Sequence, residues 1–186
     1  MKYIIKRVSV FVVLSLCTVI TRAETWILTP QSRVGFDIKS MGVSVVKGTF
    51  GQVQSKMNFN INHPEKSSVQ FALKVNSLNV NKSSLQNKIM GEDLFYVAKY
   101  KTVVFKSTQF KFLGNNKYNI QGLLTLRGVT RSVIFNTTLR PNATNGKLLD
   151  VYASSIIKRS DFGMEPSNSG IGERVNLQIS GQWMMK

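Results

Sequence analysis

The 186-residue sequence is poor in the side chains that most enzymes and metal proteins use. It has one cysteine, Cys17, one histidine, His63, and only nine Asp and Glu residues beside 25 Lys and Arg residues. One cysteine cannot form an intramolecular disulfide. With one cysteine and one histidine, the sequence also has too few of the side chains from which Cys/His metal sites and the usual nucleophile–base pairs are built. His63 stands before Pro64 in a polar stretch, which is typical of a solvated loop. The composition therefore predicts no catalytic histidine and no metal site.

Paired carboxylates and phosphate-binding loops are missing as well. Glu92 and Asp93 are adjacent, but they stand at a predicted helix start, where acidic side chains are stabilised by the helix dipole. The Gly-Ile-Gly sequence at residues 170–172 lacks the strand–turn–helix setting that a glycine-rich phosphate loop requires. Nothing singles out a pair of carboxylates for acid–base chemistry. We therefore predict that the protein is not an enzyme.

Long apolar runs are absent except near the start of the chain. A basic segment, residues 2–7, precedes the apolar stretch 8–20, and residues 21–23 end in alanine, which is the pattern of a secretory signal peptide. The stretch is shorter than the roughly 20 residues that a membrane-spanning helix needs. A lipid anchor on Cys17 is the alternative, and it is disfavoured because Leu16 stands where a small residue is expected.

Removal of residues 1–23 would leave a single domain, residues 24–186, without cysteine. A secreted domain of this size can rely on its core instead of disulfides, and we predict a periplasmic location. The removed segment holds four of the 25 basic residues and no acidic one, so the remainder carries a formal charge of +12. Such a surface favours transient contact with anionic membranes. Export argues against nucleic acid as a partner, and the oligomeric state is left open.

Apolar and polar residues alternate with period two through most of the processed chain, which predicts β-strands. The number of segments, about eight, is the number at which a closed barrel either packs solid or holds one small ligand. We predict an all-β fold, a barrel of about eight strands with a short helical segment at residues 81–100. The alternating segments are residues 26–28, 34–38, 57–61, 69–75, 103–105, 118–139, 151–155 and 175–183.

The sequence GLLTLRGVTRSVIF, residues 122–135, predicts a hairpin within this barrel. Gly128 and Val129 would form the centre of a type II′ turn, because glycine accepts the positive φ that its first central position needs. Leu123 and Ile134 are then apolar exceptions on a mostly polar outer face. The expected inward pairs are Leu124–Val133, Gly122–Phe135 and Tyr118–Leu139.

Residues 81–100 break the period of two. Apolar residues four apart in this segment predict a short helix, or two helices interrupted near Gly91, with Asn81 or Ser83 as the N-cap. We expect the apolar side of this helical segment to plug or cover one end of the barrel.

The inward-facing side chains of these strands include several phenylalanines, and two interpretations stay open. The rings could fill a solid core, or they could line an elongated apolar cavity for an alkyl or prenyl chain, with Gly122, Ala153 and Ser155 leaving room. If there is a cavity, we expect its lipid-binding wall to consist of Phe36, Phe59, Phe71, Leu73, Phe105, Ile120, Leu124 and Phe135.

The sequence KRSDFGM, residues 158–164, contains the most distinctive charged group. Arg159 and Asp161 are close enough in sequence to form an ion pair that braces the barrel end, and the Phe-Gly pair after them can turn the chain inward. Contact with a ligand headgroup is the alternative role for Arg159. Lys88, in the helical segment, is the second candidate for the rim or the headgroup.

Several of these segments, taken in order, resemble the YceI family of secreted, lipocalin-like lipid-binding proteins. They are SRVGFDIKSMGVSVVKGTFG, SLNVN, GEDLFYVAKY, VVFKST, GLLTLRGVTRSVIF and KRSDFGM, and they extend over nearly the whole processed chain. The resemblance implies that the barrel is antiparallel, lipocalin-like and periplasmic, with a long internal tunnel for a polyisoprenoid or another long-chain amphipathic lipid. It implies no enzymatic activity and no cofactor other than such a bound isoprenoid or fatty chain.

The chain departs from the family pattern at polar positions. Gln31 and Ser40 stand where family members often have histidine, and Leu85-Gln86 stands where Arg-Asp is frequent. A headgroup role cannot be transferred to these residues. We expect an isoprenoid quinone or a polyprenyl phosphate as ligand, with a fatty acid or fatty amide next. The alternative function is that of a solid-cored secreted barrel that acts through its basic surface in envelope stress or protein interaction.

Overall fold

The structure is a computed structural model that describes residues 24–40, 43–164 and 172–186. The predicted signal peptide, residues 1–23, lies outside the described residues. The described part contains eleven strands, one α-helix and three 3-10 helices. The strands are β1 (Glu24–Leu28), β2 (Arg33–Ser40), β3 (Val43–Phe50), β4 (Val53–Phe59), β5 (Ser68–Lys74), β6 (Leu78–Val80), β7 (Thr102–Gly114), β8 (Lys117–Leu126), β9 (Val129–Pro141), β10 (Leu148–Lys158) and β11 (Arg174–Met185). The helices are η1 (Pro64–Lys66), η2 (Val75–Ser77), α1 (Ser83–Met90) and η3 (Ser160–Phe162).

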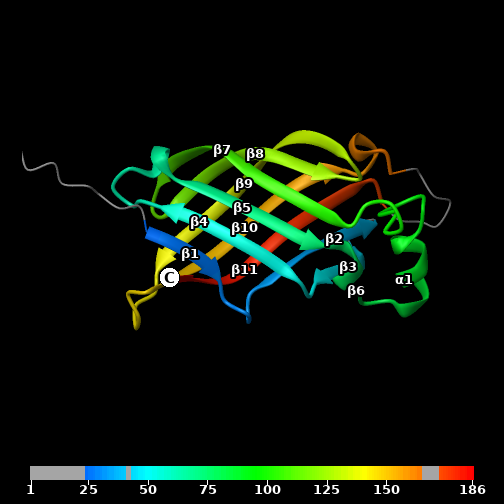
Figure 1. The fold of residues 1–186 in the computed structure, drawn as a ribbon, viewed down its shortest axis with the longest axis horizontal. Coiled ribbons are helices and arrows are strands. Elements are labelled where there is room, and N and C mark those ends of the chain that lie inside the picture. Colours follow the sequence, from blue (N-terminus) through cyan, green and yellow to red (C-terminus); the bar gives the residue numbers. More distant parts are fainter. Residues whose placement is uncertain (1–23, 41–42, 165–171) are drawn as a thin grey trace, which may run out of the picture.

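The eleven strands close into an antiparallel barrel of eight long strands, three of which are interrupted (Figure 1). β1 and β2 both pair with β11 and act as one broken strand. β3 and β4 pair with β2 and β1, and β6 and β5 pair in turn with β3 and β4. Uninterrupted strands β7 to β11 complete the ring. The predicted fold class, an antiparallel barrel of about eight strands with a short helical segment, is confirmed.

The core lies inside this ring, as the period of two requires. Along β8 every second residue from Tyr118 to Leu126 is buried, and β9 and β10 show the same alternation. Inward-facing side chains therefore converge on one interior, while the outer face is largely polar. No helix among the described residues is long and apolar enough to cross a membrane.

The β8–β9 hairpin forms as expected, but its predicted register was wrong by two residues. The turn is centred on Arg127 and Gly128, whose φ angles of 53° and 74° both lie in the left-handed region that a type I′ turn needs. Gly122 therefore pairs with Val133, and Phe135 pairs with Ile120. A shift of two keeps each side chain on its predicted face, so the barrel interior is unchanged.

A contact distant in sequence accompanies this turn. The Arg127 Nη1 atom donates hydrogen bonds to the carbonyl oxygens of Asp93 and Leu94, each at 2.8 Å. These bonds join the hairpin to the segment that follows α1, and they hold Arg127 at the barrel end. The alternation of apolar and polar residues around residue 128 could not predict these hydrogen bonds.

One helix, α1, and the turns that follow it cover one end of the barrel, beside β3 and β6 (Figure 1). Ile89, Leu94 and Phe95 are buried there, which agrees with the expected apolar cover. The predicted caps were wrong. Lys82 occupies the N-cap without a side-chain hydrogen bond, Ser83 is the first helical residue, and the Asn81 side-chain oxygen instead accepts the N–H of Lys47 at 2.7 Å. We refer below to the end covered by residues 83–97 as the lid end.

An apolar cavity in the barrel

The barrel interior encloses an apolar cavity of about 120 Å³. On β10 its lining residues run from Val151 to Ile157, about 20 Å at 3.3–3.4 Å of strand rise per residue, and Arg159 lines it just beyond the strand. Ile89, Leu94 and Phe95 line it at the lid end, and Trp183 is a further lining residue, on β11. All but three of the lining residues are apolar, aromatic or glycine. The three polar ones are Thr137, Arg159 and Gln178, and the Gln178 side chain is exposed and donates a hydrogen bond to the Asp37 carboxylate at 2.9 Å.

The structure brings seven of the eight predicted wall residues together around this cavity. They are Phe36, Phe71, Leu73, Phe105, Ile120, Leu124 and Phe135. Phe59 is buried but does not line it. It is the last residue of β4, which ends away from α1 (Figure 1), and its ring packs edge-on against Tyr118 with 5.7 Å between the ring centres. Burial there raises the pKa of the Tyr118 hydroxyl. Phe59 thus belongs to the packed base of the barrel.

Aromatic pairs determine how much of the interior is open. Phe105 and Phe135 meet edge to face, with ring centres 5.1 Å apart, and Phe71 and Trp183 are 5.5 Å apart. Of the small residues expected to leave room, Ala153 lines the cavity. Gly122 does not leave room, because the ring of Phe105 lies over it and occupies the space that a Cβ would take. Ser155 is buried but is not among the lining residues.

Several wall residues were not among those selected from the sequence. Phe95 is the clearest case: it lies in the turns after α1 and packs against Phe36 at 5.8 Å and Phe50 at 6.2 Å between ring centres. No periodic pattern surrounds it, so the sequence gives no signal. Trp183 could have been found, since it continues the alternating inward series of β11 that includes Val175 and Ile179.

Arg159 is the charged side chain among the described residues that line the cavity. It is buried, with 4% of its surface exposed, and its Nε atom lies 3.6 Å from the Glu173 carboxylate and 3.2 Å from the Gly172 carbonyl oxygen. The predicted pair with Asp161 was wrong. Asp161 is an exposed residue within η3, and its main-chain oxygen accepts a hydrogen bond from the Nε atom of Arg131 at 3.1 Å. The ion pair thus joins the residue that follows β10 to the residue that precedes β11.

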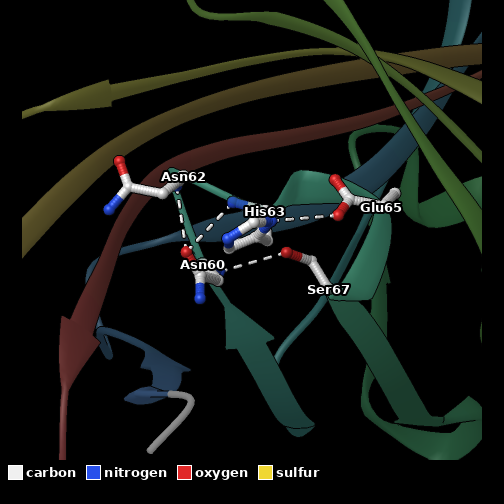
Figure 2. A network of polar contacts seen from close by, with 5 residues as sticks. All are labelled: Asn60, Asn62, His63, Glu65 and Ser67. Carbon is white, nitrogen blue, oxygen red and sulfur yellow. Dashed lines mark hydrogen bonds and ion pairs between the residues drawn. The ribbon is translucent and has the colours of Figure 1, made fainter. Parts of the chain in front are cut away.

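Lys88 and His63 do not reach the cavity. Lys88 is exposed on α1 and is not a lining residue. His63 lies in the exposed β4–β5 connection, where its Nδ1 atom is 3.3 Å from Glu65 (Figure 2). The Asn60 side-chain oxygen accepts the main-chain N–H groups of Asn62 and His63, which explains this network as the frame of a turn.

The described residues contain no group of three or more His, Cys, Asp or Glu side chains that could hold a metal ion. The chemistry that the cavity offers is therefore that of an apolar container with one buried, ion-paired guanidinium near its covered end. A closed antiparallel barrel with such an interior has the lipocalin-like architecture, in which about eight strands leave space for one small ligand.

Comparisons with known proteins agree with this class. The family model of the YceI-like domain matches residues 26–183, and the chain belongs to the YceI-like family. The UPF0312 protein plu2095 of Photorhabdus laumondii is 31% identical over 150 residues, which cover 79% of this chain and 78% of that protein.

Solved structures show the same fold. BcnA of Burkholderia cenocepacia superimposes with a TM-score of 0.74 at 24% identity, covering 84% of this chain and 98% of that one. A polyisoprenoid binding domain from Saccharophagus degradans, implicated in plant cell wall breakdown, gives a TM-score of 0.65 at 14% identity, covering 89% of this chain and all of that one.

Proposed function

We propose that this protein binds a long-chain amphipathic lipid in its interior cavity, without catalysis, and carries or stores it in the periplasm. An isoprenoid, such as a quinone or a polyprenyl phosphate, is the favoured ligand, and a fatty acid or fatty amide comes next. The observation that carries the proposal is the cavity wall: the side chains along its whole length are apolar, apart from Thr137, Arg159 and Gln178. The polyisoprenoid binding domain with the same fold supports the ligand class.

Hydrocarbon burial supplies the affinity in this proposal. Each Å² of apolar surface removed from water contributes about 25 cal/mol, so a chain of ten or more carbons binds without strong polar recognition. The free cavity of about 120 Å³ is smaller than the roughly 150 Å³ cavity that holds one benzene in an engineered protein. A long chain therefore needs the aromatic walls or the lid residues to move apart when it enters.

We place the polar end of the ligand at the lid end in this proposal, because Arg159 is the charged residue among the described residues that line the cavity. Its guanidinium is already paired with Glu173, whose side chain is 42% exposed. An anionic headgroup would compete with this carboxylate for Arg159, whereas a neutral oxygen could accept a hydrogen bond and leave the ion pair intact. Among the ligands named above, the arrangement therefore favours a quinone over a polyprenyl phosphate and a fatty amide over a fatty acid.

Titration of a fluorescent prenyl or fatty-acid probe at two salt concentrations tests the proposal. The dissociation constant is expected to change by less than about twofold between roughly 0.1 M and roughly 1 M NaCl, because a chain inside the barrel is not screened. His63→Ala, in the exposed turn, is the control and is expected to bind the probe like the parent protein. Binding that weakens more than about tenfold in high salt would favour the alternative, a barrel that acts through its basic surface.

A further inference from the structure

The charges of the barrel wall are distributed unevenly. From Leu94 to Leu149 the sequence contains no Asp or Glu, and it contains nine Lys and Arg residues in that interval. This stretch includes all of β7, β8 and β9, three neighbouring strands of the ring. On β10 the acidic residue is Asp150, whose Oδ1 atom accepts hydrogen bonds from Asn142 at 3.1 Å and Gln182 at 2.8 Å; these bonds lower the pKa of its carboxyl group.

The same wall exposes apolar side chains. Leu123 on β8, Ile134 on β9 and Ile156 on β10 are 46%, 49% and 56% exposed, although apolar residues elsewhere on these strands point inward. Leu123 lies opposite Ser132, and Ile134 is two residues further along β9, so the two side chains are diagonal neighbours on the outer face. Ile156 is two residues beyond Ser154 on β10, and Ile134 is two residues before its partner Asn136 on β9, so both exposed side chains lie just past the end of the β9–β10 ladder.

Basic residues surround this group. Lys106 on β7 lies directly opposite Leu123, and Lys158 follows Ile156 by two residues on the same face of β10. Arg174 on β11 is the partner of Lys158. All three are exposed. We call the six residues together the docking patch: Leu123, Ile134, Ile156, Lys106, Lys158 and Arg174.

The docking patch lies at the lid end of the barrel wall. Leu123 is four residues from the Arg127 turn that contacts the lid segment, and Lys158 precedes the cavity residue Arg159. The ladder between β9 and β10 ends at the Asn136–Ser154 pair, so residues 129–135 and 155–158 are not paired with each other. The patch thus flanks the part of the wall where two neighbouring strands lack ladder hydrogen bonds.

The positive charge and the exposed aliphatic side chains of the docking patch together indicate the kind of partner that it binds. Anionic lipid headgroups attract surface Lys and Arg residues, and half-exposed aliphatic side chains gain from contact with the acyl boundary beneath them. A second copy of the chain fits poorly, because a twofold contact would set Lys106, Lys158 and Arg174 against the same residues of the other copy. Nucleic acid would use the charges but not the three aliphatic side chains.

We infer that the docking patch attaches the barrel reversibly to the surface of an anionic lipid bilayer. Attachment places the lid end, and the part of the wall where β9 and β10 lack ladder hydrogen bonds with each other, beside the membrane, where a lipid ligand would enter or leave. The attachment uses the outer wall only and does not depend on the proposed cavity ligand.

Vesicle sedimentation with the protein purified from its host tests this inference. We expect binding to vesicles of phosphatidylglycerol and phosphatidylcholine in equal parts, and at least about tenfold weaker binding to vesicles of phosphatidylcholine alone. The triple variant Leu123→Thr, Ile134→Thr, Ile156→Thr keeps β-compatible side chains and is expected to bind anionic vesicles about tenfold more weakly. The pair Lys106→Glu, Lys158→Glu is expected to weaken binding by a similar or larger factor.

Matched controls use equally exposed residues elsewhere. The triple variant Ile61→Thr, Leu113→Thr, Met184→Thr removes three exposed apolar side chains near the ends of β4, β7 and β11, which lie away from α1 (Figure 1). Lys56→Glu, Lys74→Glu reverses two charges on β4 and β5. Both controls are expected to bind within about twofold of the parent. Probe uptake into the cavity, measured in parallel, is expected to be the same in all variants, so a failure of docking is distinguishable from a failure of ligand binding.

Four outcomes would overturn the inference. They are equal binding to charged and uncharged vesicles, undiminished binding by both patch variants, equal losses in patch and control variants, and a concentration-dependent dimer that the patch variants abolish.

Discussion

Replacing Ala153 with phenylalanine is expected to lower the affinity for a long-chain probe about a hundredfold. Ala153 is a small inward-facing residue of β10 that lines the cavity, between Thr137 on β9 and Ile179 on β11. An added ring would fill the narrow interior. Excluding about 110 Å² of ligand contact at 25 cal/mol per Å² costs about 2.8 kcal/mol, which corresponds to that factor.

The matched control for this variant is Ala72→Phe. Ala72 lies on β5 between the inward residues Phe71 and Leu73, so its side chain points outward. The control adds the same ring without entering the cavity, and its probe affinity is expected to stay within about twofold of the parent. Chemical unfolding of both variants separates a blocked cavity from a lost fold, because overpacking a core costs about 1–3 kcal/mol. An Ala153→Phe protein that folds and binds the probe normally would show that the ligand lies elsewhere.

The second large effect is expected from Gly122→Ala. A Cβ atom at this position would lie 2.5 Å from the carbonyl oxygen of Lys106, which is main chain, and would collide with the ring of Phe105. The backbone of β7 cannot move without breaking its ladder with β8. We therefore expect the free energy of unfolding to fall by about 3 kcal/mol, measured by urea denaturation.

Gly146→Ala provides the comparison for Gly122→Ala. A Cβ atom at residue 146 would meet nothing within 4 Å, so we expect stability within about 0.5 kcal/mol of the parent protein. Equal stability of the two variants would contradict the packing of Phe105 over Gly122. Since Phe105 also forms the cavity wall with Phe135, a destabilised but folded Gly122→Ala protein should bind the probe more weakly as well.

The inward face of each strand could be predicted because alternation is a local property. The side chains of Phe71 and Leu73, and those of Ile120 and Leu124, point inward for the reason that the sequence suggests. The position of a residue along the barrel axis is not determined by the local sequence. Phe59 has the same alternation as Phe71, yet it lies in the packed base, and alternation alone could not separate the two.

Features that depend on contacts between residues distant in sequence could not be predicted from the sequence. The hairpin register depends on a turn whose Arg127 bonds to residues more than thirty positions away. Arg159 pairs with Glu173 instead of the nearby Asp161, because the start of β11 returns to its side. The break between β1 and β2 is bridged by Ser32 and Gln182, with the Gln182 N–H donating to the Ser32 hydroxyl at 3.0 Å. Each of these pairings joins segments that only the closed barrel brings together.

Native mass spectrometry of the protein purified from its host, combined with solvent extraction, tests the central claim most directly. A lipid in the interior should survive purification in a fraction of the molecules. We expect the native mass spectrum to contain a second peak, heavier than the protein by one long-chain lipid. This peak should disappear after extraction and should be missing from the spectrum of the Ala153→Phe variant. A single unliganded mass, with no lipid in the extract, would contradict the claim.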